Sequence, residues 1–305
     1  MRVELTGTEA LRFDDGSPVR AASAALAMPT GLLVVQDDAT HACWHRTTGT
    51  EKIRLLPPVE GHDTFSEAAG TKQLKPDLEA ACRLPQLGPD VALLLGSGST
   101  PRRMRAVVVD VGSGRTSTRD LAPLHARAAA LLGIDDRQLN LEGACVVGDV
   151  LRWFQRGRPA GGLPTASVDV PLEALLDALA RGAAVTEVPV RHALTYDLGE
   201  VDGTGLAITD VVALPDGRLL VSAAAEDSPD AYDDGPVLGS ALALLDGADV
   251  LDVVTLPRLG GRAAKVEGLT LLDADAGLGE LRLLAVADQD DPATPSPLLT
   301  LRVGP

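Results

Sequence analysis

The feature that most restricts the fold of this chain is a short motif that recurs five times. Residues 78–82 (LEAAC) resemble residues 141–145 (LEGAC) and 266–270 (VEGLT), and residues 208–212 (ITDVV) and 22–26 (ASAAL) are weaker copies. Each copy is followed by a second short apolar run, and a third often follows. Internal repetition of this kind indicates an architecture built from equivalent units.

The runs themselves have the character of strands. Most are four to seven residues long and are separated by Gly, Pro, Asp and Ser, which is typical of short antiparallel strands. Residues 29–31 (PTG) and 215–217 (PDG) are hairpin-turn sequences between the first and second runs. Helical periodicity is restricted to Leu121–Leu132 and Leu172–Ala180, which Gly133 and Gly182 terminate. The sequence therefore predicts an all-β fold with short helical insertions.

Aligning the copies gives the size of the unit. The aligned residues follow one another at spacings of 56, 63, 67 and 58 residues, and the two chain ends together supply a fifth interval of 61. A four-stranded propeller blade needs roughly 40–50 residues, so loops and helices account for the rest. The prediction is one five-bladed β-propeller domain over residues 1–305, with the helices inserted between blades. A strand around Leu5 to Phe13 is expected to close the last blade and remove its exposed edge.

Two other folds are compatible with the pattern. A sixth blade could be formed by residues 183–206, which are weakly patterned. A pair of β-sandwiches would also use many short antiparallel strands.

The aligned position carries an oxygen-bearing side chain in every copy. Because the first strand of each blade lines the channel of a propeller, these side chains are expected to face one axis. Three crowded carboxylates repel each other, so either their pKa values rise or a cation neutralises them. The aligned residues, which we call the ring residues, are Ser23, Glu79, Glu142, Thr209 and Glu267.

An all-oxygen ring with three negative charges suits Ca²⁺, which takes about six to eight oxygen ligands. Mg²⁺, bound through waters, is the alternative. Zinc is disfavoured because the five His and three Cys have no ligand-like spacing. Without an ion, the ring would hydrogen-bond water in a wet channel.

The second strands are expected to end at the same face as the ring. Their last residues align as Asp37, Ser97, Arg156, Ala224 and Asp288. Asp37 and Asp288 are therefore candidate catalytic bases that activate a water molecule. Arginine presents a planar fork of donors to carboxylate or phosphate. The arginines at this end of the channel, which we call its mouth, therefore predict a site for an anionic small molecule. The candidate substrate-binding residues are Ser97, Arg102, Arg103, Arg156 and Glu226.

Acidic and basic side chains in adjacent loops also form ordinary ion pairs. The arginines and carboxylates of the mouth could therefore neutralise each other instead of binding a substrate.

The ring order Ser-Glu-Glu-Thr-Glu, one residue per blade, resembles that of the calcium-activated nucleotidases (soluble apyrases). That resemblance implies a five-bladed propeller with calcium on its axis. Residues 265–269 (KVEGL) carry the closest local likeness, and the Glu-Gly strands also resemble esterase-like phytase propellers and an uncharacterised bacterial propeller group. Residues 37–41 depart from the apyrase pattern, since they are DDATH rather than DDRTG. Only the five ring positions are carried over.

Charge and composition exclude several classes of protein. The net charge of −16 disfavours nucleic-acid partners. No apolar run approaches the roughly 18 residues of a membrane span, and the N-terminus lacks the apolar stretch of a signal peptide. Cys43, Cys82 and Cys145 cannot form a disulfide framework. We therefore expect a cytoplasmic protein, and the four Lys among 27 basic residues suggest a bacterial, GC-rich genome.

The leading hypothesis is a calcium-dependent hydrolase of an anionic small molecule, such as a phosphoester or another ester. The alternative is a non-catalytic propeller in which the ion links the blades and the top face binds a partner. The sequence makes no prediction of the oligomeric state.

Overall fold

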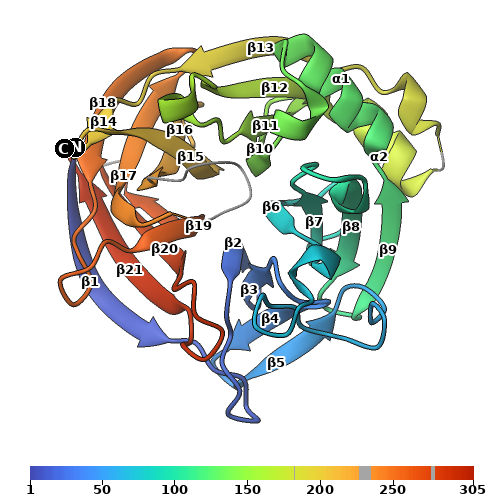
Figure 1. The fold of residues 1–305 in the computed structure, drawn as a ribbon, viewed down its shortest axis with the longest axis horizontal. Helices are drawn as coiled ribbons and strands as arrows, with labels where there is room; N and C mark the ends of the chain where they lie inside the picture. The colour runs from blue at the N-terminus through green and yellow to red at the C-terminus, as the bar shows by residue number, and fades with distance from the viewer. Residues whose placement is uncertain (182, 227–234, 276–278) are drawn as a thin grey trace.

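The computed structural model of the protein describes residues 1–181, 183–226, 235–275 and 279–305. Five antiparallel sheets surround a central axis in the order of the chain (Figure 1). The prediction of an all-β, five-bladed propeller is confirmed.

The blades are numbered along the chain. Blade 1 contains β2 (Ala22–Met28), β3 (Gly31–Gln36), β4 (His41–Arg46) and β5 (Gly49–Arg54). Blade 2 contains β6 (Leu78–Arg83), β7 (Val91–Gly96), β8 (Arg105–Asp110) and β9 (Arg115–Asp120). Blade 3 contains β10 (Leu141–Val147), β11 (Val150–Gln155), β12 (Thr165–Pro171) and β13 (Arg191–Tyr196).

Blade 4 contains β14 (Glu200–Val201), β15 (Thr204–Ala213), β16 (Leu219–Glu226), β17 (Val237–Asp246) and β18 (Asp249–Thr255). Blade 5 contains β19 (Lys265–Asp275), β20 (Glu280–Asp288), β21 (Pro297–Gly304) and β1 (Arg2–Ala10). Short 3₁₀ turns are η1 (Lys72–Leu74), η2 (Pro101–Arg103), η3 (Asp136–Gln138), η4 (Pro159–Gly161) and η5 (Val185–Glu187).

Residues 183–206 do not form a sixth blade. They contribute η5, the outer strand β13 of blade 3 and the two-residue strand β14, which pairs with the start of β15. The weak apolar pattern of this segment arises because β13 is mostly exposed to solvent.

The two helices occur where periodicity predicted them. The first, α1 (Ala122–Leu132), lies between blades 2 and 3 and ends at Gly133, which adopts the left-handed conformation (φ 69°). The second, α2 (Leu172–Ala180), lies within blade 3, between β12 and β13, rather than between blades as predicted. Both pack in the apolar cluster that blades 2 and 3 share, at the periphery of the ring (Figure 1). None of the described helices could cross a membrane.

Strand β1 forms the outer edge of blade 5. It pairs antiparallel with β21, from Arg2 opposite Gly304 to Ala10 opposite Pro297. The last blade therefore combines strands from both ends of the chain, and the ring of blades is joined by backbone hydrogen bonds.

The inner strands share one irregularity, which lies at the ring residues. In β2, β6, β10, β15 and β19 the pairing register shifts at the position of Ser23, Glu79, Glu142, Thr209 and Glu267, respectively. A β-bulge changes the direction of a side chain relative to its strand. The residues that the sequence repeat aligned are therefore structural equivalents.

Next to the bulges, two glycines allow neighbouring blades to approach closely. A Cβ atom on Gly268 would lie 2.5 Å from Val286 Cγ2 and 2.7 Å from the Ala24 carbonyl carbon. A Cβ atom on Gly143, whose φ is +75°, would lie 2.9 Å from Asp210 Cα. Only glycine fits these positions without displacing backbone.

We predict that Gly268→Ala lowers the free energy of unfolding by about 1–3 kcal/mol, because the added methyl group overpacks the contact between blades 5 and 1. Urea denaturation followed by circular dichroism measures the change. Gly7→Ala in β1 is the matched control, since its Cβ would meet Thr300 at ordinary contact distances of 3.4 Å and more. Equal stability of the two variants would show that the close approach is not needed.

Candidate functional site

A polar cavity of about 530 Å³ lies at the axis, on the face where the inner strands begin. Its walls come from the ring residues, the ends of the second strands and the loops beside them. Among the described residues, nine acidic and seven basic side chains line it. The acidic ones are Asp37, Glu67, Asp77, Glu79, Glu142, Glu226, Glu267, Asp288 and Asp290. The basic ones are Lys72, Lys75, Arg103, Arg137, Arg156, Arg158 and Lys265.

The five ring residues divide into two groups. Glu79, Glu142 and Glu267 line the cavity, whereas Ser23 and Thr209 are buried and do not. Ser23 Oγ donates a hydrogen bond to the Leu78 carbonyl oxygen at 2.6 Å, and Thr209 Oγ1 donates one to that of Val266 at 2.7 Å. Each hydroxyl thus holds the backbone directly before the ring glutamate of the next blade.

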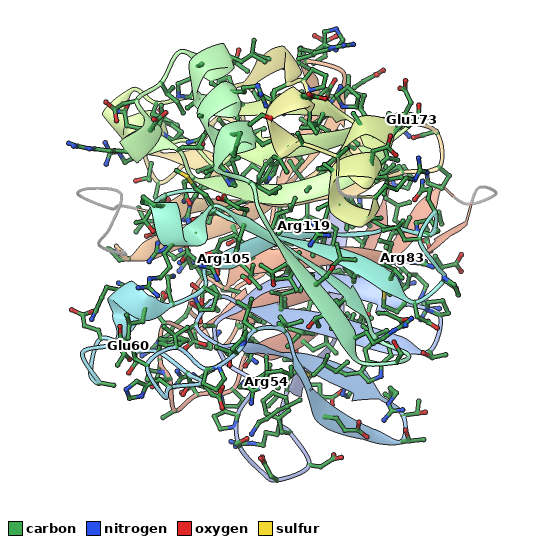
Figure 2. All side chains as sticks on the ribbon, turned by 90° about the vertical axis from the view of Figure 1, so that its right-hand side faces the viewer. Arg54, Glu60, Arg83, Arg105, Arg119 and Glu173 are labelled. Carbon is green, nitrogen blue, oxygen red and sulfur yellow. The ribbon has the colours of Figure 1, made fainter. Side chains whose placement is uncertain are left out.

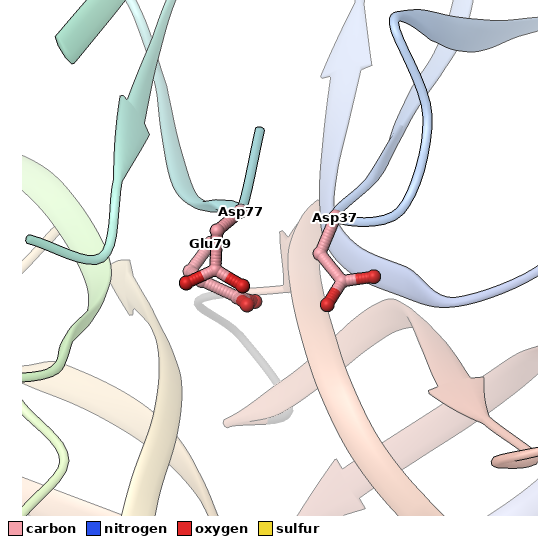
Figure 3. A group of neighbouring side chains, drawn as sticks. All are labelled: Asp37, Asp77 and Glu79. Atoms are coloured by element: carbon pink, nitrogen blue, oxygen red, sulfur yellow. The ribbon is translucent and has the colours of Figure 1, made fainter. Parts of the chain in front are cut away.

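A buried lysine lies within the predicted ring. Lys75 Nζ is 2.6 Å from Asp77 Oδ1 and 4.0 Å from Glu79 Oε1, and it also pairs with Asp37 Oδ2. Figure 3 shows these three carboxylates turned toward one another from blades 1 and 2. Among the described residues, they are the group of three whose oxygens lie within 4.8 Å of one another, which is suitable spacing for a metal ion. The Lys75 ammonium group already supplies a positive charge to all three.

Two further cations connect blades across the cavity. Lys265 Nζ is 3.0 Å from Glu267 Oε1 and 3.7 Å from Glu226 Oε2, which belong to blades 5 and 4. Arg156 donates to Glu142 Oε1 at 3.0 Å and to Glu226 Oε2 at 2.5 Å, and so connects blades 3 and 4. The ring glutamates of blades 3 and 5 are therefore paired with protein cations.

Burial sets the protonation of the carboxyl groups. It raises the pKa of Glu267 to about 8, although Lys265 opposes the shift. Burial, reinforced by Asp37, raises the pKa of Asp288 to about 7. Burial also raises the pKa of Glu79 and Glu142. The cavity therefore contains carboxyl groups that retain protons near neutral pH, because the protein cations do not compensate all of their charge.

For Lys75 and Asp77, neighbouring charges together affect the pKa more than burial does. Burial alone would lower the pKa of Lys75, but Asp37, Asp77 and Glu79 raise it well above its ordinary value. Burial would raise the pKa of Asp77, but Lys75 and Arg103 lower it to about 2. Lys75 and Asp77 are therefore fully charged in the folded protein at neutral pH.

Five of the seven residues predicted at the mouth line the cavity, Ser97 lies behind the lining and Arg102 lies outside it. Asp37, Asp288 and Glu226 line the cavity, as do Arg103 and Arg156.

Both of these arginines are already paired with carboxylates, as the ion-pair alternative anticipated. Arg103 donates to Asp77 Oδ2 at 2.8 Å and to Ser99 Oγ at 2.9 Å. Ser97 is buried behind the lining and donates to Asp77. Arg102 is exposed and lies outside the lining.

Sequence reasoning missed Lys75, Lys265 and Asp77. A signal was present, because two of the four lysines in the chain precede a ring glutamate, by four residues in one case and by two in the other. Scarcity of lysine makes that placement informative. Asp77 adopts the left-handed conformation (φ 57°) at the entry to β6, which the sequence pattern does not reveal.

Comparison with solved structures finds chains of similar length and low identity. The Myxococcus xanthus glutaminyl cyclase is 10% identical with a TM-score of 0.46, over 97% of this chain and 96% of that chain. The endo-arabinase of Bacteroides thetaiotaomicron is 9% identical with a TM-score of 0.47, over 96% of each chain. Streptogramin B lyase is 8% identical with a TM-score of 0.45, over 97% of each chain. These similarities are too low to indicate an activity.

No curated protein matches the sequence. The resemblance to apyrases and phytases stays a prediction. A family model does match, and it covers residues 71–292, which include blades 2 to 4 and the two inner strands of blade 5. The chain therefore belongs to the family of unknown function DUF6910.

Proposed function

We propose that the axial cavity is the active site of a hydrolase that acts on a small anionic molecule, such as a phosphoester or another ester. The observation that carries the proposal is the convergence of carboxyl groups and a buried amine in one cavity. Asp288 and Glu267 face it, and Lys265 Nζ lies 3.0 Å from Glu267. Carboxyl groups and buried cations at one cavity are the components of acid–base hydrolysis.

Asp288 is the candidate general base. It ends β20, and its Oδ1 accepts hydrogen bonds from the backbone N–H of Gln289 at 2.7 Å and Asp290 at 3.1 Å. These bonds fix the carboxyl group at the cavity wall. A pKa of about 7 is well matched to proton transfer at neutral pH.

Asp37 is the second candidate base. Its Oδ2 is paired with Lys75, whereas its buried Oδ1 has no hydrogen-bond partner among the described residues. A hydrogen-bond donor at that oxygen, such as a water molecule, would satisfy it.

Lys265 would stabilise negative charge that develops on the substrate. Its side chain is only 6% exposed, and a buried ammonium group acts more strongly on a developing charge than one in water. Arg103 and Arg156 are held by carboxylates, so we assign them to positioning the acidic groups.

The calcium ion stays a prediction, and the residues at the axis do not favour it. The one suitable carboxylate group of the described chain, Asp37, Asp77 and Glu79, already contains the Lys75 ammonium group. A divalent cation would have to displace that group against its ion pairs. No step of the proposed hydrolysis therefore depends on a metal.

A non-catalytic binding propeller is the second candidate function. The ion pairs of Lys75, Arg156 and Lys265 each join neighbouring blades, as expected for groups that only stabilise the ring. An activity screen separates the two functions.

We predict that Asp288→Asn and Glu267→Gln lower kcat/KM by about 10²–10⁴-fold on any ester or phosphoester that the wild type hydrolyses, because proton transfer is lost. The measurement is a panel of nitrophenyl esters, lactones, nucleotides and phosphomonoesters. The matched control is Glu173→Gln, an exposed residue at the start of α2 (Figure 2). Wild-type rates in both cavity variants would refute the assignment, and absence of turnover across the panel would favour the binding propeller.

We predict that stability falls as the pH rises from about 5 to about 8. In the folded protein Glu267 holds its proton up to a pKa of about 8, whereas its ordinary pKa is 4.5. Between these values the folded state binds more protons than the unfolded state, so raising the pH favours unfolding. Each such group contributes at most about 1.4 kcal/mol per pH unit within this window.

Urea denaturation at pH 5.5, 7 and 8.5 measures this dependence. Glu267→Gln should flatten part of the slope, while Glu173→Gln should leave it unchanged. A stability that rises with pH over the same range would contradict the protonated state of the cavity.

We predict that millimolar Ca²⁺ leaves the Tm of the wild type unchanged relative to EGTA, whereas Lys75→Gln gains a Ca²⁺-dependent rise. Removing the ammonium group leaves three carboxylates at metal-binding spacing, of which Asp77 is still paired with Arg103. Lys52→Gln is the control, because Lys52 pairs with Asp15 at the surface. A Ca²⁺-dependent rise in the wild type would instead support the axial ion predicted from the sequence.

A further inference from the structure

We infer that Arg137 and Arg158 form an anion-binding subsite at the rim of the axial cavity, which would hold the phosphate or carboxylate group of the substrate. The inference rests on the proposed function, because it assigns the part of the substrate that does not react. The sequence placed Arg158 beside Arg156 in an arginine-bearing loop at the mouth of the channel, but it did not predict Arg137.

The guanidinium groups of Arg137 and Arg158 differ from those of Arg103 and Arg156, which are paired with carboxylates. Both line the cavity, Arg137 from η3 and Arg158 from the turn after β11. Across the described residues, neither guanidinium group makes an ion pair or a hydrogen bond. Arg103 and Arg156, in contrast, are engaged by Asp77 and by Glu142 and Glu226. An arginine fork without a carboxylate partner can bind an external oxyanion with two parallel hydrogen bonds.

The turn that carries Arg137 is fixed by a capping box. Asp135 Oδ1 accepts the backbone N–H of Arg137 at 2.9 Å, and Gln138 Oε1 accepts that of Asp135 at 3.3 Å. These bonds hold η3 in one conformation.

A buried glutamine ties this turn to the strand that leads to Arg158. Gln155, which is 1% exposed, donates to the Gln138 carbonyl oxygen at 3.0 Å and accepts the Asn140 N–H at 2.8 Å. The Arg156 N–H bonds the Asn140 carbonyl oxygen at 2.9 Å. The two arginine-bearing turns are therefore held in a fixed relation.

The backbone of Arg158 is held by its own pair of hydrogen bonds. Its N–H donates to the Leu163 carbonyl oxygen at 2.7 Å, and the Leu163 N–H donates back at 3.1 Å. Because the turns are already fixed, binding has to order only the two arginine side chains, which lowers its cost in conformational entropy.

The charge distribution then orients the ligand. Arg137 is exposed, and Arg158, Asp288 and Glu267 are partly buried, so the cavity extends from the interior to the solvent. The interior cations Lys75, Arg156 and Lys265 are paired with carboxylates, whereas the two rim guanidinium groups can attract an anionic group, so the reacting ester would point inward. A volume of about 530 Å³ suits a small molecule with two such ends.

Isothermal titration calorimetry at low ionic strength tests the subsite, with inorganic phosphate and malonate as the probes. We expect the wild type to bind at least one probe saturably, phosphate indicating a substrate with a phosphate group apart from the reacting ester and malonate a carboxylate-bearing one. Arg137→Gln and Arg158→Gln should each weaken binding about tenfold, since a charge-assisted hydrogen bond is lost, and the double variant more. The matched control is Arg83→Gln, an exposed arginine at the end of β6 opposite to Glu79 (Figure 2).

Two results would overturn the subsite: no saturable binding of either probe by the wild type, or wild-type affinity in the double variant with unchanged circular dichroism. The proposed function is judged separately. If probe binding depends on both arginines but no ester is hydrolysed, the subsite stands and the hydrolase fails. If a substrate is hydrolysed with an unchanged KM in the double variant, the hydrolase stands and the subsite fails.

Discussion

The site depends on a β-bulge that occurs at one equivalent residue in each of the five inner strands. The bulge turns the side chains of Glu79, Glu142 and Glu267 into the axial cavity, while Ser23 and Thr209 turn toward the next blade. A regular strand would alternate its side chains between the two faces of the blade and would not gather one residue per blade at the same level. Backbone geometry, rather than composition, brings the acidic groups together.

Gathering buried carboxylates has an electrostatic cost that the protein meets in two ways. Some are neutralised by Lys75, Lys265 and Arg156, each of which contacts carboxylates of two neighbouring blades. Others retain a proton, as the raised pKa values of Glu267 and Asp288 indicate. The same compensation that makes burial tolerable also produces titratable groups near neutral pH, which is a property of sites that transfer protons.

Much of the fold could be predicted because the constrained position repeats. Every blade has an oxygen-bearing side chain at the bulge, so the repeat can be traced even at Ser23 and Thr209, where the local sequence differs most. Both helices were predictable from their apolar period.

The finer details of the site could not be predicted, for physical reasons. A hydroxyl group can face either the axis or a neighbouring carbonyl oxygen, and nothing in the local sequence of Ser23 distinguishes the two. Lys75 and Lys265 occupy unequal offsets before their ring glutamates, so they do not align with each other. Arg137 lies on a turn outside the aligned strands, and alignment of the repeats gives no information about it.

The position of the two helices has a consequence for how such a chain can change over time. Both helices lie at the periphery, beside blade 3. The inner strand of that blade still has its bulge at Glu142, the position equivalent to the bulges of the other four blades. A lengthened connection therefore leaves the inner strand and its bulge in place, and the same connection can add a residue such as Arg137 to the cavity rim. In a propeller of this kind, the loops can change the lining of the cavity while the inner strands keep their geometry.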